Sequence, residues 1–214
     1  MIHYPMVPLV LDLSGRRVVI FGGGAVGARK ASFFAGEADV MAVSQSFIPE
    51  FDALPVEKVV RDLTGVSDGD LAGLLEGAFL AVAATDDPSI NDRIGKICRV
   101  SGIHFNNARG IPGDVVLPAV SWGIHHAIAI TTFGKAPGMA RFLRERLEEE
   151  YPGLDPMIEL TERLRAALKR RVMDQGGRQA VIARVLADRD VWEAVSGGQD
   201  QAWNLVEGRY LHDR

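Results

Sequence analysis

The sequence has very little cysteine. Cys98 is the only one among 214 residues, so one chain can form neither an internal disulfide nor a four-thiolate metal site. A long hydrophobic run is also missing, since the longest covers only residues 78–84 and a membrane span needs about 20. The first 17 residues have no basic start, and Asp12 interrupts their apolar stretch, unlike a secretory signal. We therefore expect a cytoplasmic protein without a membrane partner.

Neither sign of charge dominates. Lys and Arg together number 24 and Asp and Glu 28, which gives a net charge of −4. Such a balance does not favour nucleic acid as a partner. Hydrophobic residues make up 47% and charged residues 24%, close to the averages of globular proteins, which excludes a disordered or fibrous chain.

The first half of the chain alternates short apolar runs with helical patterns. The apolar runs predict strands over residues 16–21, 40–43, 57–60, 79–84 and 103–106. Helices are predicted over 25–36 and 91–100, with a further one opening at 71–75. Alternation at this spacing is typical of a parallel sheet with helices on both faces. The predicted fold class is α/β, with a Rossmann-like parallel-sheet domain.

The second half has a different pattern. Two strands are predicted over 115–120 and 127–132, with the turn at Trp122-Gly123, and Pro137 begins a helix. Beyond Gly153 the pattern is helical: Asp155-Pro156 are predicted as N-cap and first position, and Gly176-Gly177 as the end. We predict a Rossmann-like domain over 1–114, a small β dimerisation region over 115–150 and an all-helical domain over 151–214.

A glycine turn follows the first predicted strand and opens a helix. Gly22, Gly24 and Gly27 have the spacing of a dinucleotide-binding turn. In that interpretation Gly22 permits the tight turn, Gly24 lets a pyrophosphate approach the backbone, and Gly27 lets helix and strand pack closely. The alternative is a glycine-rich turn without a ligand, which the strand–turn–helix context makes the weaker interpretation.

The acidic residue that usually holds the ribose of a dinucleotide is absent. The expected place, at the end of the second strand, holds Ser44, Gln45 and Ser46, whose side chains can still hydrogen-bond a ribose hydroxyl. An NADP site would need a nearby arginine, and Arg61 is too far along the chain, so the pattern favours NAD. Thr85 and Asp86 follow the fourth strand, where a nicotinamide would lie. Their alternative role is capping before Pro88.

Further motifs surround the glycine turn in a fixed order. They are Tyr4-Pro5, Gly22-Gly23-Gly24-Ala25-Val26-Gly27-Ala28-Arg29-Lys30-Ala31, Phe47-Ile48-Pro49, Ala84-Thr85-Asp86-Asp87 with Asn91, Phe105-Asn106, Val116-Leu117-Pro118-Ala119, Gly134-Lys135-Ala136-Pro137 and Ala140-Arg141-Phe142-Leu143-Arg144. In these motifs, over residues 1 to about 150, the chain resembles the precorrin-2 dehydrogenase / sirohydrochlorin ferrochelatase family. That family also occurs as the N-terminal module of siroheme synthase.

The resemblance implies an enzyme that oxidises precorrin-2 to sirohydrochlorin with NAD and in some members inserts ferrous iron, a lyase activity. It implies a homodimer built around the bridging β-region. Backbone N–H groups of Ala25 and Val26 would meet the pyrophosphate, and Gln45 and Ser46 the adenosine ribose. The tetrapyrrole carries carboxylates, for which the basic candidates are Arg29, Lys30, Arg109, Lys135, Arg141 and Arg144. For each of them the alternative is a solvated surface residue or a local ion pair.

The chain departs from the family after Phe105-Asn106. The family places an aspartate shortly before a proline there, and it is taken to act in dehydrogenation and chelation. Here Arg109 stands at that position and Asp114 follows five residues later. Either Asp114 takes over the role of the family aspartate or that role is absent. Metal insertion is the first activity that this change puts in question. His104 is the other catalytic candidate, because an imidazole can accept protons near neutral pH. Its alternative is a core histidine.

Metal ligands are not identified in the sequence. His125 and His126 are adjacent, and neighbours on a strand point to opposite faces, so they carry little weight as a pair. Two alternatives to the dehydrogenase stay open. One is a chelatase that has lost redox function, and the other is a non-catalytic protein that senses nucleotides or tetrapyrroles.

Overall fold

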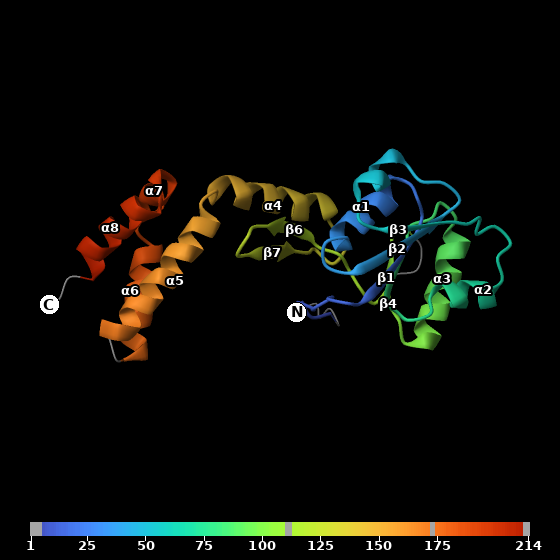
Figure 1. Cartoon of the computed structure of the whole chain (residues 1–214), viewed down its shortest axis with the longest axis horizontal. Helices are drawn as coiled ribbons and strands as arrows, with labels where there is room; N and C mark the ends of the chain where they lie inside the picture. Colours follow the sequence, from blue (N-terminus) through green and yellow to red (C-terminus); the bar gives the residue numbers. More distant parts are fainter. Residues whose placement is uncertain (1–5, 110–112, 172–173, 212–214) are drawn as a thin grey trace. The chain divides into compact units, whose positions relative to one another are not determined.

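The computed structural model describes residues 6–109, 113–171 and 174–211, and the Tyr4-Pro5 motif lies outside them. The chain divides into two compact units, Met1–Leu117 and Pro118–Arg214, and each is described by itself (Figure 1). The sequence-based division, with its boundary at residue 150, stays a prediction. No helix in the described ranges combines the length and apolar character needed to cross a membrane.

The first unit is built on a five-stranded parallel sheet, as the sequence predicts. Its strand order is β3-β2-β1-β4-β5. The strands are β1 (Arg17–Phe21), β2 (Asp39–Ser44), β3 (Glu57–Val60), β4 (Ala78–Ala83) and β5 (His104–Asn107). The order changes direction between β1 and β4, which is where ligands bind in open sheets of this type.

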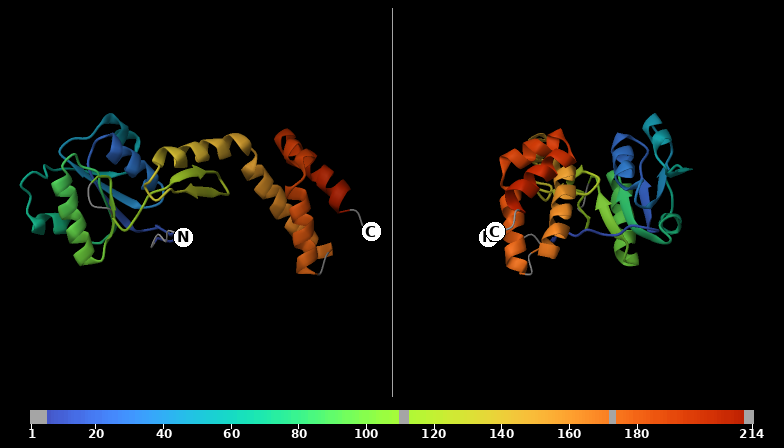
Figure 2. Two further views of the ribbon diagram at one scale, coloured as in Figure 1. Left: turned by 180° about the vertical axis from the view of Figure 1, so that it is seen from behind. Right: turned by 60° about the vertical axis from the view of Figure 1, so that its left-hand side comes forward.

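Helices cover both faces of this sheet (Figures 1 and 2). On one face α1 (Ala25–Phe34) and the short 3₁₀ helix η1 (Pro49–Ala53) pack over alternate β1 side chains such as Val18. On the other face α2 (Asp68–Leu74) and α3 (Pro88–Ser101) pack over the intervening ones, such as Val19. Side chains alternate between the two faces of a strand, so this apolar strand is buried on both sides.

The second unit joins a hairpin to helices. Strands β6 (Ala119–Trp122) and β7 (Ala127–Ile130) pair antiparallel, and α4 (Pro137–Glu150) begins at the predicted proline. Buried side chains such as Leu160, Leu164 and Val206 form the core of the helices that follow. These are α5 (Leu154–Arg171), α6 (Gln175–Leu186), α7 (Arg189–Gly197) and α8 (Gln199–Tyr210). The predicted small β-region and helical C-terminal part are confirmed.

Several predicted boundaries are wrong. The helix predicted to open at 71–75 instead begins at Asp68 and ends at Leu74, because Ser67 caps it by accepting the Asp70 N–H (3.1 Å). The strand expected from residue 115 begins only at Ala119, because the Val115 N–H donates to the Phe105 carbonyl (3.0 Å) and Val115 packs against the first unit's sheet. Gly176-Gly177 do not end a helix but lie in the first turn of α6. The Asp174 carboxylate accepts the Gly177 N–H (2.6 Å), and this cap outweighs the poor helix propensity of two glycines.

Asp155 joins the β6–β7 turn to α5 instead of capping the helix. Its carboxylate accepts the N–H groups of Ile124 (2.8 Å) and His125 (3.0 Å) and lies 2.8 Å from His126 Nδ1. His125 Nε2 lies 3.1 Å from Glu159 Oε1, one turn further along α5. Both histidines therefore contact α5 from the turn. The strand-based argument that they point apart is wrong, because β7 begins only at Ala127.

We expect Asp155→Asn to lower the Tm at pH 7 by several degrees. The N–H groups of His125 and Ile124 hold the pKa of Asp155 at about 2, below its ordinary value of 3.8. A carboxyl whose pKa is lower in the folded state stabilises it above the ordinary value, and this contribution disappears as pH falls through 2. The Tm difference between wild type and variant should therefore shrink from pH 7 towards pH 2. A difference that does not change with pH would contradict a charge-dependent role.

Candidate active site

The glycine turn joins β1 to α1 at the carboxyl edge of the sheet. Gly22 has φ +124°, which disfavours any residue with a side chain, and a Cβ there would collide with the Ala84 carbonyl. A Cβ at Gly27 would collide with the Gly22 carbonyl, so Gly27 permits the close helix–strand packing that the sequence predicts. Gly23, whose role the sequence analysis missed, leaves room for Ser44 and the Ser46 carbonyl.

No contact with the described residues requires a glycine at position 24. Its backbone is extended (φ −87°, ψ −174°), and a Cβ would meet nothing within 4 Å among the described residues. No side chain caps α1, so the first N–H groups of the helix, including those of Ala25 and Val26, have no intrahelical partner. An open backbone in front of an uncapped helix N-terminus fits an approaching phosphate group.

The end of β2 lies beside this turn. The Ile48 N–H donates to the Gly23 carbonyl (3.0 Å), which holds the segment after β2 against the glycines. Ser44 is half-buried, whereas Gln45 and Ser46 are exposed. The site therefore offers hydroxyl and amide groups, with no carboxylate at residues 44–46, where a ribose would lie.

Arg61 is closer to this place than its position in the sequence suggests. Its N–H donates to the Ser44 carbonyl (2.9 Å), because β3 pairs in parallel with β2 and both strands end at the same edge. Distance along the chain therefore does not keep Arg61 away from residues 44–46, and the preference for NAD stays a prediction. The Arg61 guanidinium, however, is paired with the Asp70 carboxylate (3.2 Å), and Asp70 also accepts the Ser67 hydroxyl (2.6 Å).

Thr85, just after β4, is held by Asn91 of α3. The buried Asn91 side chain accepts the Thr85 N–H (3.2 Å) and hydroxyl (2.7 Å) and donates to the Thr85 carbonyl (3.1 Å). Asp87 is the N-cap of α3, and its bonds to Ser89 lower its pKa. The capping role considered for Thr85 and Asp86 thus belongs to Asp87. Asp86 is exposed, with no hydrogen bond or ion pair to other residues in the described ranges.

The end of β5 reaches the same edge. Phe21, Ala83 and Asn107 are in register across β1, β4 and β5. The Arg109 N–H donates to Asn107 Oδ1 (3.0 Å), and the Arg109 side chain is exposed. Arg109 therefore lies at the edge that carries the glycine turn and Thr85, and its role in substrate binding stays a prediction.

Asn106 is a polar group whose burial the sequence analysis missed. Its side chain is 6% exposed, and its Nδ2 donates to the Val115 carbonyl (2.8 Å). Its Oδ1 has no partner among the described residues. Only its appearance in the family motif singled it out in the sequence.

His104 and Asp114 lie together at the other end of β5. Asp114 Oδ1 accepts the Phe105 N–H (2.6 Å), and Oδ2 lies 3.4 Å from His104 Nδ1. His104 precedes Asn107 by roughly 10 Å along the strand, at about 3.3 Å per residue. Because β5 is an edge strand, no neighbouring strand accepts the Phe105 N–H on its outer side, and the Asp114 carboxylate accepts it instead. The alternative of a core histidine is wrong, because the His104 side chain is 48% exposed. The catalytic role of the two residues stays a prediction.

Three further basic candidates, Lys135, Arg141 and Arg144, lie in the second unit. Arg141 Nε donates to Glu145 Oε1 (2.7 Å) within α4, and Lys135 is exposed just before that helix. In the first unit, burial and the neighbouring Arg29 lower the pKa of the half-buried Lys30. In the described ranges, no group of three or more His, Cys, Asp or Glu side chains is arranged to hold a metal ion.

Comparison with known proteins agrees with this geometry. Residues 9–119 match the family described as "Putative NAD(P)-binding". The chain is 38% identical over 201 residues to the precorrin-2 dehydrogenase of Methanosarcina barkeri, covering 92% of this chain and 89% of that protein. This chain belongs to the precorrin-2 dehydrogenase family.

Longer relatives and a solved structure are also similar to this chain. The siroheme synthase of Azotobacter vinelandii is 32% identical over 95% of this chain, which spans 44% of that protein's length. The siroheme synthase of Sodalis glossinidius is 28% identical, and the chain spans 43% of it. The solved structure of SirC, a precorrin-2 dehydrogenase, shares the fold with a TM-score of 0.69 at 20% identity, covering 95% of this chain and all of that one.

Proposed function

We propose that this chain oxidises precorrin-2 to sirohydrochlorin and uses NAD as the hydride acceptor. The observation that carries the proposal is the glycine turn. It leaves an open backbone at Gly24 in front of an uncapped helix, in a chain that is 38% identical to a precorrin-2 dehydrogenase along most of its length.

The oxidation removes one hydride and one proton from the tetrapyrrole, and bound NAD supplies the hydride acceptor. Backbone N–H groups at Ala25 and Val26 bind the pyrophosphate at the helix N-terminus. Hydroxyl and amide groups of Ser44, Gln45 and Ser46 hold the adenosine ribose. The Thr85–Asp86 segment, fixed by Asn91, positions the nicotinamide end.

Substrate carboxylates are bound by Arg109 in the first unit and by Lys135 and Arg141 in the second, each assigned by itself. Arginine and lysine suit this role because they donate charge-assisted hydrogen bonds to carboxylates. Arg141 already donates to Glu145, so a substrate carboxylate must displace or share that contact. Arg109 stands at the carboxyl edge of β5, where the family places an aspartate. Metal insertion, for which that aspartate is taken to be needed, is not part of the proposal.

The preference for NAD over NADP rests on the Arg61–Asp70 pair. The Arg61 N–H donates to the Ser44 carbonyl at the end of β2, and its guanidinium is engaged by Asp70 (3.2 Å). We expect Asp70→Asn to raise kcat/KM with NADP by about fivefold to tenfold while kcat/KM with NAD stays the same, because a released guanidinium can meet a 2′-phosphate. Arg61→Gln is the control and should not improve NADP use. Equal kcat/KM with NADP in all three proteins would exclude Arg61 as the determinant.

A homodimer through the second unit is also proposed. Large apolar side chains are exposed on β6, the β6–β7 turn and α4, which is typical of an interaction surface. They are Trp122 (63% exposed), Ile124 (84%), Met139 (52%), Phe142 (53%) and Leu143 (42%). Sedimentation equilibrium should give twice the 23.2 kDa chain mass. A chain that stays monomeric at micromolar concentration would contradict the proposal.

Asp114→Asn tests whether Asp114 replaces the family's aspartate. Asparagine keeps an oxygen that can accept the Phe105 N–H and removes only the charge. A general base at Asp114 requires kcat to fall by more than about tenfold at unchanged Tm. We expect kcat to stay within about threefold of wild type, because Asp114 lies at the amino end of β5. The larger fall would establish Asp114 as the catalytic carboxylate.

The proposed activity is tested by anaerobic incubation with precorrin-2 and either NAD or NADP, followed through the absorbance of the reduced nicotinamide. We expect kcat/KM with NAD to exceed that with NADP by about tenfold or more. Reduction of neither cofactor would overturn the dehydrogenase and favour a chelatase or a sensor. Ferrous ion added after complete oxidation tests metal insertion separately.

A further inference from the structure

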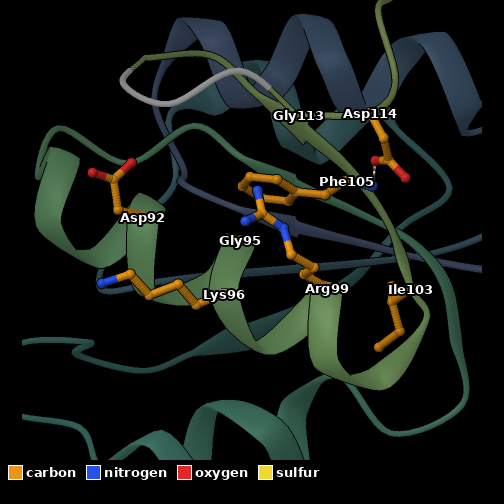
Figure 3. A pocket seen from close by; sticks show the side chains of 8 residues that line it. All are labelled: Asp92, Gly95, Lys96, Arg99, Ile103, Phe105, Gly113 and Asp114. Atoms are coloured by element: carbon orange, nitrogen blue, oxygen red, sulfur yellow. Dashed lines mark hydrogen bonds between the residues drawn. The ribbon is translucent and has the colours of Figure 1, made fainter.

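A cleft of about 240 Å³ lies between α3 and β5, on the face of the sheet opposite α1 (Figure 3). Phe105 and Ile103 supply apolar walls, and side chains of α3 line the other side. Two glycines allow the segments beside the cleft to pack closely against β5. A Cβ at Gly95 of α3 would collide with the Phe105 ring, and a Cβ at Gly113 would collide with the Phe105 carbonyl. No residue of the glycine turn lines it.

The charged side chains around this cleft differ in whether other residues already bind them. It is lined by two cations, Lys96 and Arg99, and by two carboxylates, Asp92 and Asp114. Asp114 accepts the Phe105 N–H and lies near His104, and Asp92 also has an interaction partner. The side chains of Lys96 and Arg99, in contrast, have no hydrogen-bond or ion-pair partner elsewhere in the described part of the chain. The groups left to meet a ligand are therefore the cations.

Position and size limit what the ligand can be. Lys96 and Arg99 are one turn apart on α3, so both can reach one anionic group while the rest of the ligand lies against Phe105 and Ile103. The cleft volume is about 240 Å³. It is below the roughly 300–1,000 Å³ of sites for drug-sized molecules, and so is too small for a tetrapyrrole or a dinucleotide.

We propose that this cleft is a second binding site, for a small organic acid with a flat apolar body. Its carboxylate is held by Arg99 and Lys96, and its body packs on the exposed part of Phe105 and on Ile103. The site is distinct from the proposed NAD site, because its residues belong to α3 and to the amino end and outer edge of β5, and it shares Asp114 with the predicted catalytic residues.

Benzoate is the probe, with acetate as the matched carboxylate that has no apolar body. Titration followed by backbone amide NMR should give a millimolar Kd for benzoate, with the largest shifts at Ile103, Phe105 and Gly113. The double variant Lys96→Gln/Arg99→Gln should weaken benzoate binding at least about tenfold, as expected for the loss of two charged contacts. Acetate should bind at least about fivefold more weakly than benzoate.

The matched control is Lys169→Gln/Arg170→Gln, which removes two exposed charges from the last turn of α5. Its benzoate affinity should equal that of wild type, and NAD affinity should be the same in all three proteins. Unchanged benzoate binding in the Lys96/Arg99 variant, equal affinity for acetate and benzoate, or no saturable shifts at the cleft would each overturn the proposal. None of these results depends on whether precorrin-2 is oxidised.

Discussion

Gly24→Asp is expected to abolish NAD binding and to leave the fold intact. The extended backbone of Gly24 accepts a side chain, and no described atom lies within 4 Å of a Cβ there. Aspartate is also a favourable N-cap, so α1 should be as stable as before or slightly more stable. Its carboxylate would, however, occupy the N–H groups proposed to bind the pyrophosphate and would repel it. Two negative charges about 4 Å apart repel by about 4 kcal/mol near a protein surface.

The measurement is NAD affinity by calorimetry together with the Tm. Kd should rise by about a hundredfold or more, and the Tm should be unchanged or higher. Gly36→Asp is the control, because Gly36 also has open space but lies beyond the other end of α1. Tight NAD binding by Gly24→Asp would show that the pyrophosphate does not lie at this helix N-terminus.

Asn91→Ala is expected to cost both stability and activity. Asn91 is fully buried and makes three hydrogen bonds to Thr85, so its loss leaves polar groups of Thr85 without partners. Such a loss costs about 2–3 kcal/mol of the free energy of unfolding. The Thr85 segment borders the glycine turn, since the missing Cβ of Gly22 faces the Ala84 carbonyl. We expect kcat/KM to fall by at least about tenfold in protein that is still folded.

Thr85→Val separates the two effects. It removes the hydroxyl, which contacts Asn91 Oδ1 (2.7 Å) and the Asp87 carbonyl (3.1 Å), and leaves the two backbone bonds to Asn91. It should therefore lower the free energy of unfolding by about 1 kcal/mol and keep most of the activity. Urea unfolding and steady-state kinetics on both variants are the measurements. Full activity of Asn91→Ala in folded protein would show that the Asn91 contacts serve stability alone.

The fold of the first unit could be predicted because local and global signals agree there. The third strand lies at the predicted residues 57–60, and the apolar stretches of β1 and β4 are buried on both sides, as expected for a parallel sheet. Pro137 begins α4 as predicted, because proline fits the first turn of a helix. The family motif at Gly22-Gly23-Gly24 added the cofactor hypothesis to this pattern.

Other features depend on contacts between residues far apart in the sequence. Arg61 appears distant from Ser44 along the chain, but the parallel pairing of β3 with β2 brings their backbones together. The Val115 segment is apolar enough for a strand, yet it packs on the sheet beside β5. Asp114 looked like a relocated catalytic residue, and only the structure shows that it accepts the Phe105 N–H. None of these positions carries a local sequence signal.

The central claim, that this chain couples oxidation of precorrin-2 to reduction of NAD, is tested most directly by the stoichiometry of anaerobic turnover. NADH and sirohydrochlorin are quantified in the same samples, with precorrin-2 limiting and NAD in excess. The proposed reaction predicts one NADH for each sirohydrochlorin in the wild type, and neither product above background with Gly24→Asp. Sirohydrochlorin formed without NADH, or tight NAD binding with neither product, would contradict it.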